Sequence, residues 1–210
     1  MPPKKRCLLW DWTNTTGPTN EGVPWAMDAV PFSESSPISS VCNWNTWTPP
    51  ELANRAPFRP MIRTEAQLNG DEWTWAASSD ADIVHFFNEP ERAGISADKA
   101  AEAWKEKMLP LRKEKGKKIV SPSCASDPAG REWIHRWMEL VCTEESGGPD
   151  FLGLHWYGTS ADEFIKYLQG MHERYPDIPV IVSEFASVSR DRDEVMEFSA
   201  KAVNWMDETE

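Results

Sequence analysis

Residues 83–91 read Ile-Val-His-Phe-Phe-Asn-Glu-Pro-Glu, a short apolar run that ends on polar residues and a proline. A continuous apolar run of this length is typical of a parallel strand that is covered on both faces. Apolar residues then recur at helical spacing over 96–114, and a second apolar run follows at 118–123. A strand, a helix and another strand in this order indicate the repeating unit of a parallel sheet.

The same alternation extends outward along the whole chain. Longer amphipathic helices are predicted at about 128–145, 159–175 and 192–206, and shorter ones at 51–56 and 65–77. A proline at 110 is expected to kink the helix over 96–114. Seven strands are predicted, at residues 7–12, 38–45, 58–63, 83–89, 118–123, 151–157 and 180–185. Because no low-complexity linker interrupts the pattern, we expect one α/β domain spanning 1–210.

Two architectures fit an alternating α/β pattern, a (β/α)8 TIM-type barrel and an open doubly wound sheet. No glycine-rich phosphate loop of the G-x-G-x-x-G type follows the first strand, so the barrel is favoured. No strand-like run remains after residue 185. The expectation is therefore a barrel truncated before its eighth strand, with exposed edges at the first and seventh strands and little activity in this form.

Composition excludes several classes of partner. The 210 residues include 22 basic and 34 acidic side chains, a formal net charge of −12, which disfavours nucleic acid and anionic membranes. No apolar run approaches the length of a membrane-spanning helix, and the one after the basic start is too short for a signal peptide. The four cysteines lack zinc-site spacing and leave disulfides open. No metal and no cofactor is therefore expected.

Polar residues close three of the predicted strands. Glu89 ends the fourth strand, His155 and Tyr157 end the sixth, and Glu184 ends the seventh. In a β/α barrel the carboxyl ends of the strands meet on one face, where active sites lie. Each residue also has an ordinary explanation: a helix N-terminal acid for Glu89, a solvated loop carboxylate for Glu184 and a satisfied core histidine for His155. Two glutamates on separate strands, with His-x-Tyr between them, favour a functional site.

Four motifs carry a resemblance to a known family. They are Leu-Leu-Trp-Asp-Trp at 8–12, Phe-Phe-Asn-Glu-Pro-Glu at 86–91, Leu-His-Trp-Tyr-Gly at 154–158 and Val-Ser-Glu-Phe-Ala at 182–186. Together they resemble glycoside hydrolase family 128, a family of fungal and bacterial β-1,3-glucanases within the retaining (β/α)8 glycosidases. The resemblance implies a monomeric, endo-acting glucanase that acts on β-1,3-glucan or its oligosaccharides. It also suggests an extracellular or cell-wall location.

By this resemblance, Glu89 is the general acid/base and Glu184 the nucleophile of a double displacement. Asn88 would bind the 2-hydroxyl of the sugar at the cleavage point. We expect the negative charge of Glu184 and apolar neighbours to raise the pKa of Glu89. A hydrogen bond from Tyr157 or the charge of Arg63 would keep Glu184 ionised.

The remaining predicted substrate contacts are aromatic or lie on the sixth strand. His155 and Tyr157 are two residues apart, so both face one side, and Trp156 faces the helices if that pair faces the site. Trp104, Trp133 and Trp137 lie at core spacing within helices. Predicted sugar-stacking platforms at the ends of the first two strands are Trp10, Trp12 and Trp44.

Two rival functions remain open at this point. A carbohydrate-binding barrel would keep the tryptophans without needing both glutamates. A metal-dependent hydrolase would use His155, Glu184 and His85, although no close ligand spacing supports it. Replacing Glu89 separates the first rival from a hydrolase, and sensitivity to chelators would reveal the second.

Overall fold

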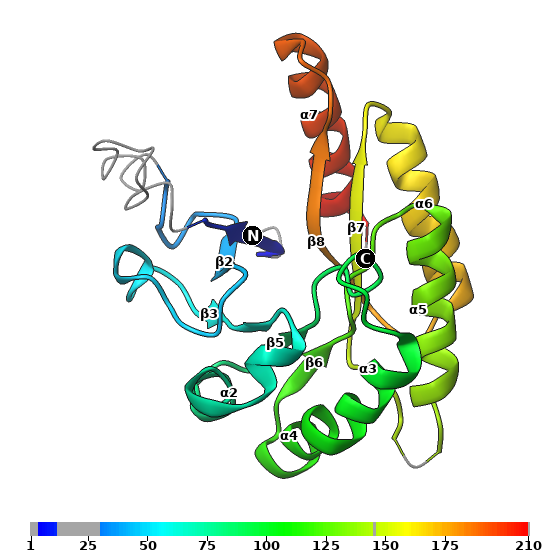
Figure 1. Cartoon of the computed structure of the whole chain (residues 1–210). Coiled ribbons are helices and arrows are strands. Elements are labelled where there is room, and N and C mark those ends of the chain that lie inside the picture. Colours follow the sequence, from blue (N-terminus) through cyan, green and yellow to red (C-terminus); the bar gives the residue numbers. More distant parts are fainter. Residues whose placement is uncertain (1–3, 12–29, 145, 210) are drawn as a thin grey trace. The chain divides into compact units, whose positions relative to one another are not determined.

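A computed structural model describes residues 4–11, 30–144 and 146–209, which fall into two compact units (Figure 1). The first unit comprises residues 1–85 and the second residues 86–210. Trp12, one of the predicted substrate contacts, lies outside the described residues.

The first unit contains a parallel sheet in the order β1-β2-β3. Its strands are β1 (Arg6–Leu9), β2 (Ile38–Cys42) and β3 (Phe58–Arg59). Trp10, Val41 and Leu52 form a buried cluster beside this sheet. Because β-branched and aromatic side chains at the strand ends are removed from water, this cluster stabilises the sheet.

Short elements complete the first unit. Pro60 separates β3 from β4 (Met61–Ile62), because proline has no backbone N–H to continue a ladder. Thr64 and Gln67 form a capping box at the start of the 3₁₀ helix η3 (Glu65–Leu68). The other elements are η2 (Pro50–Leu52), α2 (Gly70–Ser78) and β5 (Ile83–Phe86), whose last residue belongs to the second unit.

The first helical segment of the second unit runs from α3 (Ala97–Ala103) through the π-helical turn η4 (Trp104–Met108) to α4 (Leu109–Lys115). The predicted disturbance at Pro110 takes the form of this π turn. A proline would collide with the carbonyl one turn earlier, and the wider turn makes room for its ring. Gly116, with φ of 68°, ends the helix in the left-handed conformation.

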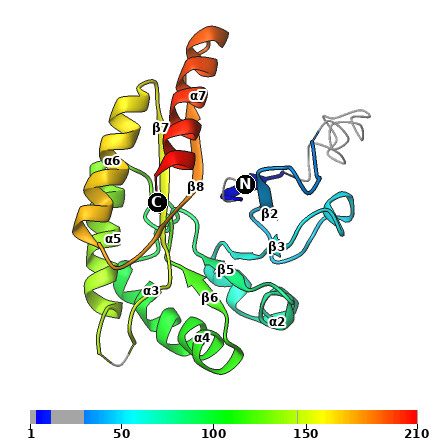
Figure 2. The same ribbon diagram turned by 180° about the vertical axis from the view of Figure 1, so that it is seen from behind.

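The rest of the second unit alternates strands and helices. They are β6 (Lys118–Val120), α5 (Pro128–Val141), β7 (Leu152–Gly158), α6 (Ala161–Arg174), β8 (Val180–Ser187) and α7 (Arg192–Glu208). Side chains of Asp127, Ser160 and Asp191 accept backbone N–H groups at the starts of α5, α6 and α7. Strands β7 and β8 are parallel, and both views show α5 beside α6 and α7 along β8 (Figures 1 and 2).

Aromatic rings fill the core of the second unit. Trp104 and Trp137 are fully buried and meet edge to face, with ring centroids 5.4 Å apart. Phe86 lies 6.3 Å from each of them and stacks on Phe87. These contacts confirm that Trp104 and Trp137 are packing residues, and each such aromatic pair adds roughly 0.5–1.5 kcal/mol beyond burial.

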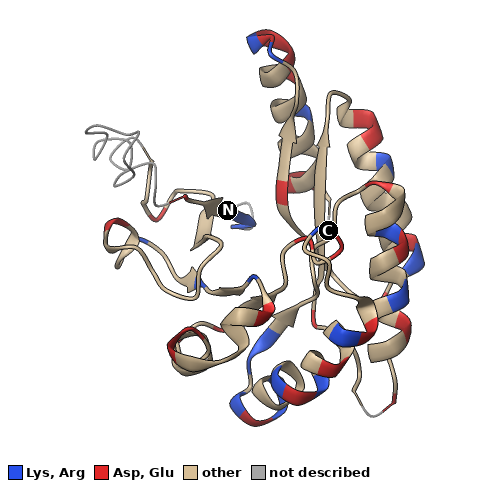
Figure 3. Cartoon of the chain, viewed as in Figure 1, with Lys and Arg blue, Asp and Glu red and all other residues tan. Residues whose placement is uncertain are grey.

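Charged side chains lie mainly on the helices of the second unit. Figure 3 shows acidic and basic residues interspersed along α4, α5 and α6, whereas β7 is almost free of them. The charges therefore mark solvated helix faces, and the strands supply the core. Among the described residues, no helix combines the length and apolarity needed to cross a membrane.

The structure confirms the α/β class and locates a strand in each of the seven predicted regions. Most boundaries differ by one to three residues, as in the fourth strand, which was predicted to reach Glu89 and ends at Phe86. Pairings within each unit are parallel where their direction is defined. A closed barrel is not formed by the ladders of the described residues, so closure stays a prediction.

Candidate active site

The register of β7 and β8 brings the predicted site residues together. His155 lies opposite Glu184 across the two strands, after an irregularity between Leu154 and His155. Trp156 points to the other side, where its ring lies 5.5 Å from Tyr167 and 6.2 Å from Phe164 of α6. The predicted alternation is confirmed: Trp156 faces the helices, and its two neighbours face the site.

The chain after β5 holds Glu89 in an uncommon conformation. Phe87 and Glu89 have φ of 43° and 41°, in a region that non-glycine residues seldom adopt. Two backbone hydrogen bonds fix the segment: Ser123 N donates to Phe87 O at 3.1 Å, and Glu89 N donates to Ser123 O at 2.8 Å. Backbone strain of this kind costs roughly 1–3 kcal/mol per residue and concentrates at functional sites.

His155 lies between the two glutamates. Its Nδ1 is 3.1 Å from Oε1 of Glu89, and its Nε2 is 3.7 Å from Oε1 of Glu184. The imidazole is completely buried, while the side chains of Glu89 and Glu184 are 22% and 9% exposed. Both carboxylates therefore approach one histidine ring from its opposite nitrogens, at the edge of solvent.

Arg92 and Asp127 also influence the pKa of Glu89. Arg92 Nε lies 3.4 Å from Oε2 of Glu89, and the Arg92 guanidinium also pairs with Asp127 at 2.8 Å. The hydrogen bond with His155 is the main cause that lowers the pKa of Glu89, and the charges of His155 and Arg92 lower it further. Burial and Asp127 act in the opposite direction.

The direction of this shift corrects the sequence prediction. We expected Glu184 and apolar neighbours to raise the pKa of Glu89, but its pKa is lowered. The physical reason is that a histidine lies between the two carboxylates and provides a hydrogen bond to Glu89. The sequence shows His155 two residues before a tyrosine but not that its ring would reach Glu89.

Tyr157 binds the second glutamate directly. Its hydroxyl donates to Oε2 of Glu184 at 2.6 Å, as predicted. Partial burial, this hydrogen bond and the nearby negative charges of Glu184 and Glu89 raise the pKa of the phenol. Tyr157 therefore stays protonated and available as a donor to the carboxylate. Tyr157 is 50% exposed, so part of the residue is accessible to a ligand.

Three further contacts, which the sequence did not reveal, support the site. Ser183 Oγ donates to Ser123 Oγ at 2.9 Å, linking β8 to the segment that holds Glu89. The carboxylate of Glu91 accepts from Ala125 N at 2.9 Å. Arg92 contacts Glu89 from three residues further along the chain. This spacing is the one feature of the sequence that could have predicted the contact. The side-chain oxygen of Asn88 is buried without a hydrogen-bond partner among the described residues.

The other predicted substrate contacts belong to the first unit. Trp10 is 8% exposed, and its indole N–H donates to Glu51 at 3.3 Å. Trp44 is half-buried. Arg63 is exposed, and its backbone N–H donates to Oε1 of Gln67 at 2.6 Å. Burial of Trp10 favours packing over sugar stacking for this indole.

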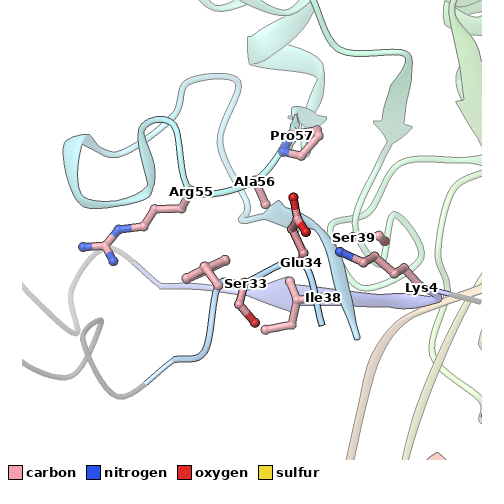
Figure 4. Close-up of a pocket in the computed structure, with 9 residues that line it drawn as sticks. Lys4, Ser33, Glu34, Ile38, Ser39, Arg55, Ala56 and Pro57 are labelled. Carbon is pink, nitrogen blue, oxygen red and sulfur yellow. The ribbon is translucent and has the colours of Figure 1, made fainter. Parts of the chain in front are cut away.

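A hollow in the first unit contains none of the predicted site residues. Its volume is about 540 Å³, and Figure 4 shows Lys4, Glu34 and Arg55 among the side chains around it. It lies by the start of β2, at Ile38, and not where the strands end. Within the described ranges, no group of three or more His, Cys, Asp or Glu side chains is arranged to hold a metal ion.

Two carboxylates flank a buried imidazole, and a tyrosine donates a hydrogen bond to one of them. A family model described as "Glycosyl hydrolase catalytic core" matches residues 20–210. A structure from Aureobasidium namibiae, titled a family 128 (subgroup VI) exo-β-1,3-glucanase, is 51% identical, with a TM-score of 0.91. That match covers 100% of this chain and 80% of the other.

Two more distant structures share the fold. An endo-β-1,3-glucanase from Lentinula edodes is 24% identical, with a TM-score of 0.78 over 98% of this chain and 80% of that one. Another, from Amycolatopsis mediterranei in complex with laminaritriose, is 22% identical, with a TM-score of 0.66 over 82% of this chain and 76% of that one. The search of curated proteins found no match. The chain belongs to the glycosyl hydrolase catalytic core family and, within it, to glycoside hydrolase family 128.

Proposed function

We propose that the protein hydrolyses β-1,3-glucan with retention of configuration, using Glu89 and Glu184. The observation that carries this proposal is the position of His155, which contacts Glu89 at 3.1 Å and Glu184 at 3.7 Å. Glu89 and Glu184 both contact this imidazole and therefore lie in one site, as a glycosidase with two carboxyl groups needs, and retention is proposed from the resemblance to family 128. The 51% identical structure from Aureobasidium namibiae, an exo-β-1,3-glucanase, supports the substrate.

In the first step, Glu184 attacks the anomeric carbon while Glu89 gives its proton to the leaving glycosidic oxygen. The bond from carbon to that oxygen breaks, and an ester between the sugar and Glu184 forms. In the second step, Glu89 takes a proton from water, which attacks the same carbon and releases Glu184. The hydrogen bond from Tyr157 fixes which way the Glu184 carboxylate faces before the attack.

The lowered pKa of Glu89 should shift the pH optimum of hydrolysis. Glu89 must begin each cycle protonated, and a lowered pKa reduces that fraction as the pH approaches neutrality. We therefore propose that the enzyme works best in acid. Its kcat/KM should fall on the alkaline side as Glu89 loses its proton.

Substrate contacts are proposed for Asn88, His155 and Tyr157 around the cleavage point. The buried, unpartnered amide oxygen of Asn88 is suited to accept a sugar hydroxyl. Platforms or polar contacts farther along the glucan are proposed, by family resemblance, for Trp12, Trp44 and Arg63. We also propose that the alternating elements belong to a (β/α)8-type barrel that acts as a monomer.

Endo action within the polymer and exo action at its chain ends are both compatible with this site. The sequence resemblance predicted endo action, whereas the 51% identical structure is titled an exo-β-1,3-glucanase, which favours release from chain ends. Product analysis on laminarin over time separates them. Exo action yields one small product from the start, and endo action yields a ladder of oligosaccharides.

Glu89→Gln and Glu184→Gln test the catalytic assignment. Each should lower kcat on laminarin by about 10²–10⁴-fold. Laminarin binding, measured by calorimetry, should stay within severalfold of the parent. Glu173→Gln, an exposed residue on α6, is the matched control and should keep full activity. Retained hydrolysis in both site variants would contradict the assignment of these two glutamates, whereas glucan binding without hydrolysis by the parent would favour a carbohydrate-binding protein.

A further inference from the structure

Two cysteines of the first unit lie side by side on neighbouring strands. Cys7 is on β1 and Cys42 on β2, and their sulfur atoms are 3.4 Å apart although the residues are separated by 35 positions. Cys7 pairs in register with Ser40, and Cys42 pairs with Leu9. Because side chains alternate along a strand, this register places both thiols on the same face of the sheet.

The thiol of Cys7 is more acidic than those of Cys124 and Cys142. Cys7 is half-buried, and Cys42 is 3% exposed. The hydrogen bond with Cys42, helped by the positive charge of Arg59 and opposed by burial, lowers the pKa of Cys7 to about 7. Burial instead raises the pKa of Cys124 and of Cys142. At neutral pH, Cys7 therefore has a larger thiolate fraction than Cys124 or Cys142, and the thiolate is the reactive form.

We propose that Cys7 and Cys42 form a modification site for small-molecule disulfides, which convert the two thiols into a disulfide between β1 and β2. The Cys7 thiolate attacks one sulfur of the incoming disulfide, whose other sulfur leaves as a thiolate and takes up a proton. Cys42 then loses its proton and attacks the Cys7 sulfur of the mixed disulfide, and a second small thiol leaves. Both cysteines are oxidised, and the small disulfide is reduced to two thiols.

The resulting bond would join two strands that meet only over a short ladder. Four register pairs connect β1 to β2, with an irregularity between Arg6 and Cys7. A disulfide across 35 positions restricts the unfolded chain and raises the melting temperature by about 5–10 °C if it forms without strain. The oxidised protein would therefore hold β1 in the sheet more firmly.

The full chain, incubated with oxidised glutathione near pH 7.5 and analysed by mass spectrometry, tests this site. The parent should lose two hydrogen atoms, and peptides containing Cys7 and Cys42 should be joined before reduction. The melting temperature should rise, and dithiothreitol should reverse both changes. Cys142→Ser, which removes an exposed thiol, should behave like the parent.

Two single variants distinguish a paired site from general thiol reactivity. Cys42→Ser should keep one glutathionyl group on Cys7, because no second thiol is present to displace it. Cys7→Ser should leave the buried Cys42 unmodified. The proposal is overturned if the parent keeps a stable glutathionyl group on Cys7, if both thiols stay reduced while Cys142 reacts, or if the linked form melts no higher than the reduced one.

Discussion

The strand pair β7–β8 and the strand pair β1–β2 show two different uses of the same parallel geometry. Seven register pairs join β7 to β8, and polar side chains at 155, 157 and 184 meet each other along them. Four pairs join β1 to β2, and the residue that follows β1, Trp10, is buried in a cluster with Val41 and Leu52. The longer pair positions chemical groups, whereas the shorter pair mainly builds a core and brings two thiols together.

Apart from Glu184 itself, loss of His155 should lower activity most among substitutions in the β7–β8 pair. His155→Ala leaves Glu89 and Glu184 without their shared neighbour, and we expect kcat/KM on laminarin to fall by about 30–300-fold. The alkaline limb of kcat/KM should move to higher pH, because the hydrogen bond that most lowers the pKa of Glu89 is lost. His135→Ala, which removes a histidine paired with Tyr175 at 2.8 Å, is the control and should keep activity. Equal losses in the two variants would argue for a general packing defect.

Removing one hydroxyl should have a smaller effect. Tyr157→Phe keeps the half-exposed ring and deletes the donor 2.6 Å from Glu184. A hydrogen bond to a charged group contributes about 1.5–3 kcal/mol, so kcat should fall by about 10–100-fold. The melting temperature should change little. Tyr175→Phe, at the C-cap of α6, controls for loss of a phenol. An unchanged kcat in Tyr157→Phe would remove Tyr157 from the mechanism.

The region around the β1–β2 pair should respond through stability and not through turnover. Trp10→Phe leaves a gap in the cluster with Val41 and Leu52 and removes the indole contact to Glu51, so we expect a loss of about 1–3 kcal/mol in unfolding free energy. Denaturant unfolding measures this loss. A large rise in KM for laminari-oligosaccharides without a stability loss would instead make Trp10 a sugar platform.

The smallest predicted effect concerns pH alone. Arg92 lowers the pKa of Glu89, so Arg92→Gln raises it and should move the alkaline limb of kcat/KM to higher pH. Asp127 raises that pKa, so Asp127→Asn should move the limb to lower pH, and asparagine still caps α5. Opposite movements in the two variants would identify Glu89 as the titrating acid. Limbs that do not move would assign the titration to another group.

Local patterns predicted the seven strand regions, the helix from 96 and the alternation at 155–157, because each depends on neighbours in sequence. They did not predict that β5 would stop at Phe86, with Phe87 and Glu89 at positive φ. That turn is fixed by backbone hydrogen bonds to Ser123, more than thirty positions away. The pKa of Glu89 was predicted in the wrong direction for the same reason, since His155 is 66 positions distant.

The most direct test of retention by Glu89 and Glu184 is the configuration of the first product. Proton NMR, begun within seconds of mixing the protein with laminarihexaose, distinguishes the α- and β-anomers of the newly formed reducing end before they interconvert. Double displacement predicts that the β-anomer appears first and the α-anomer only later, by mutarotation. Initial release of the α-anomer would contradict the account, because a single displacement by water would then operate at these two glutamates.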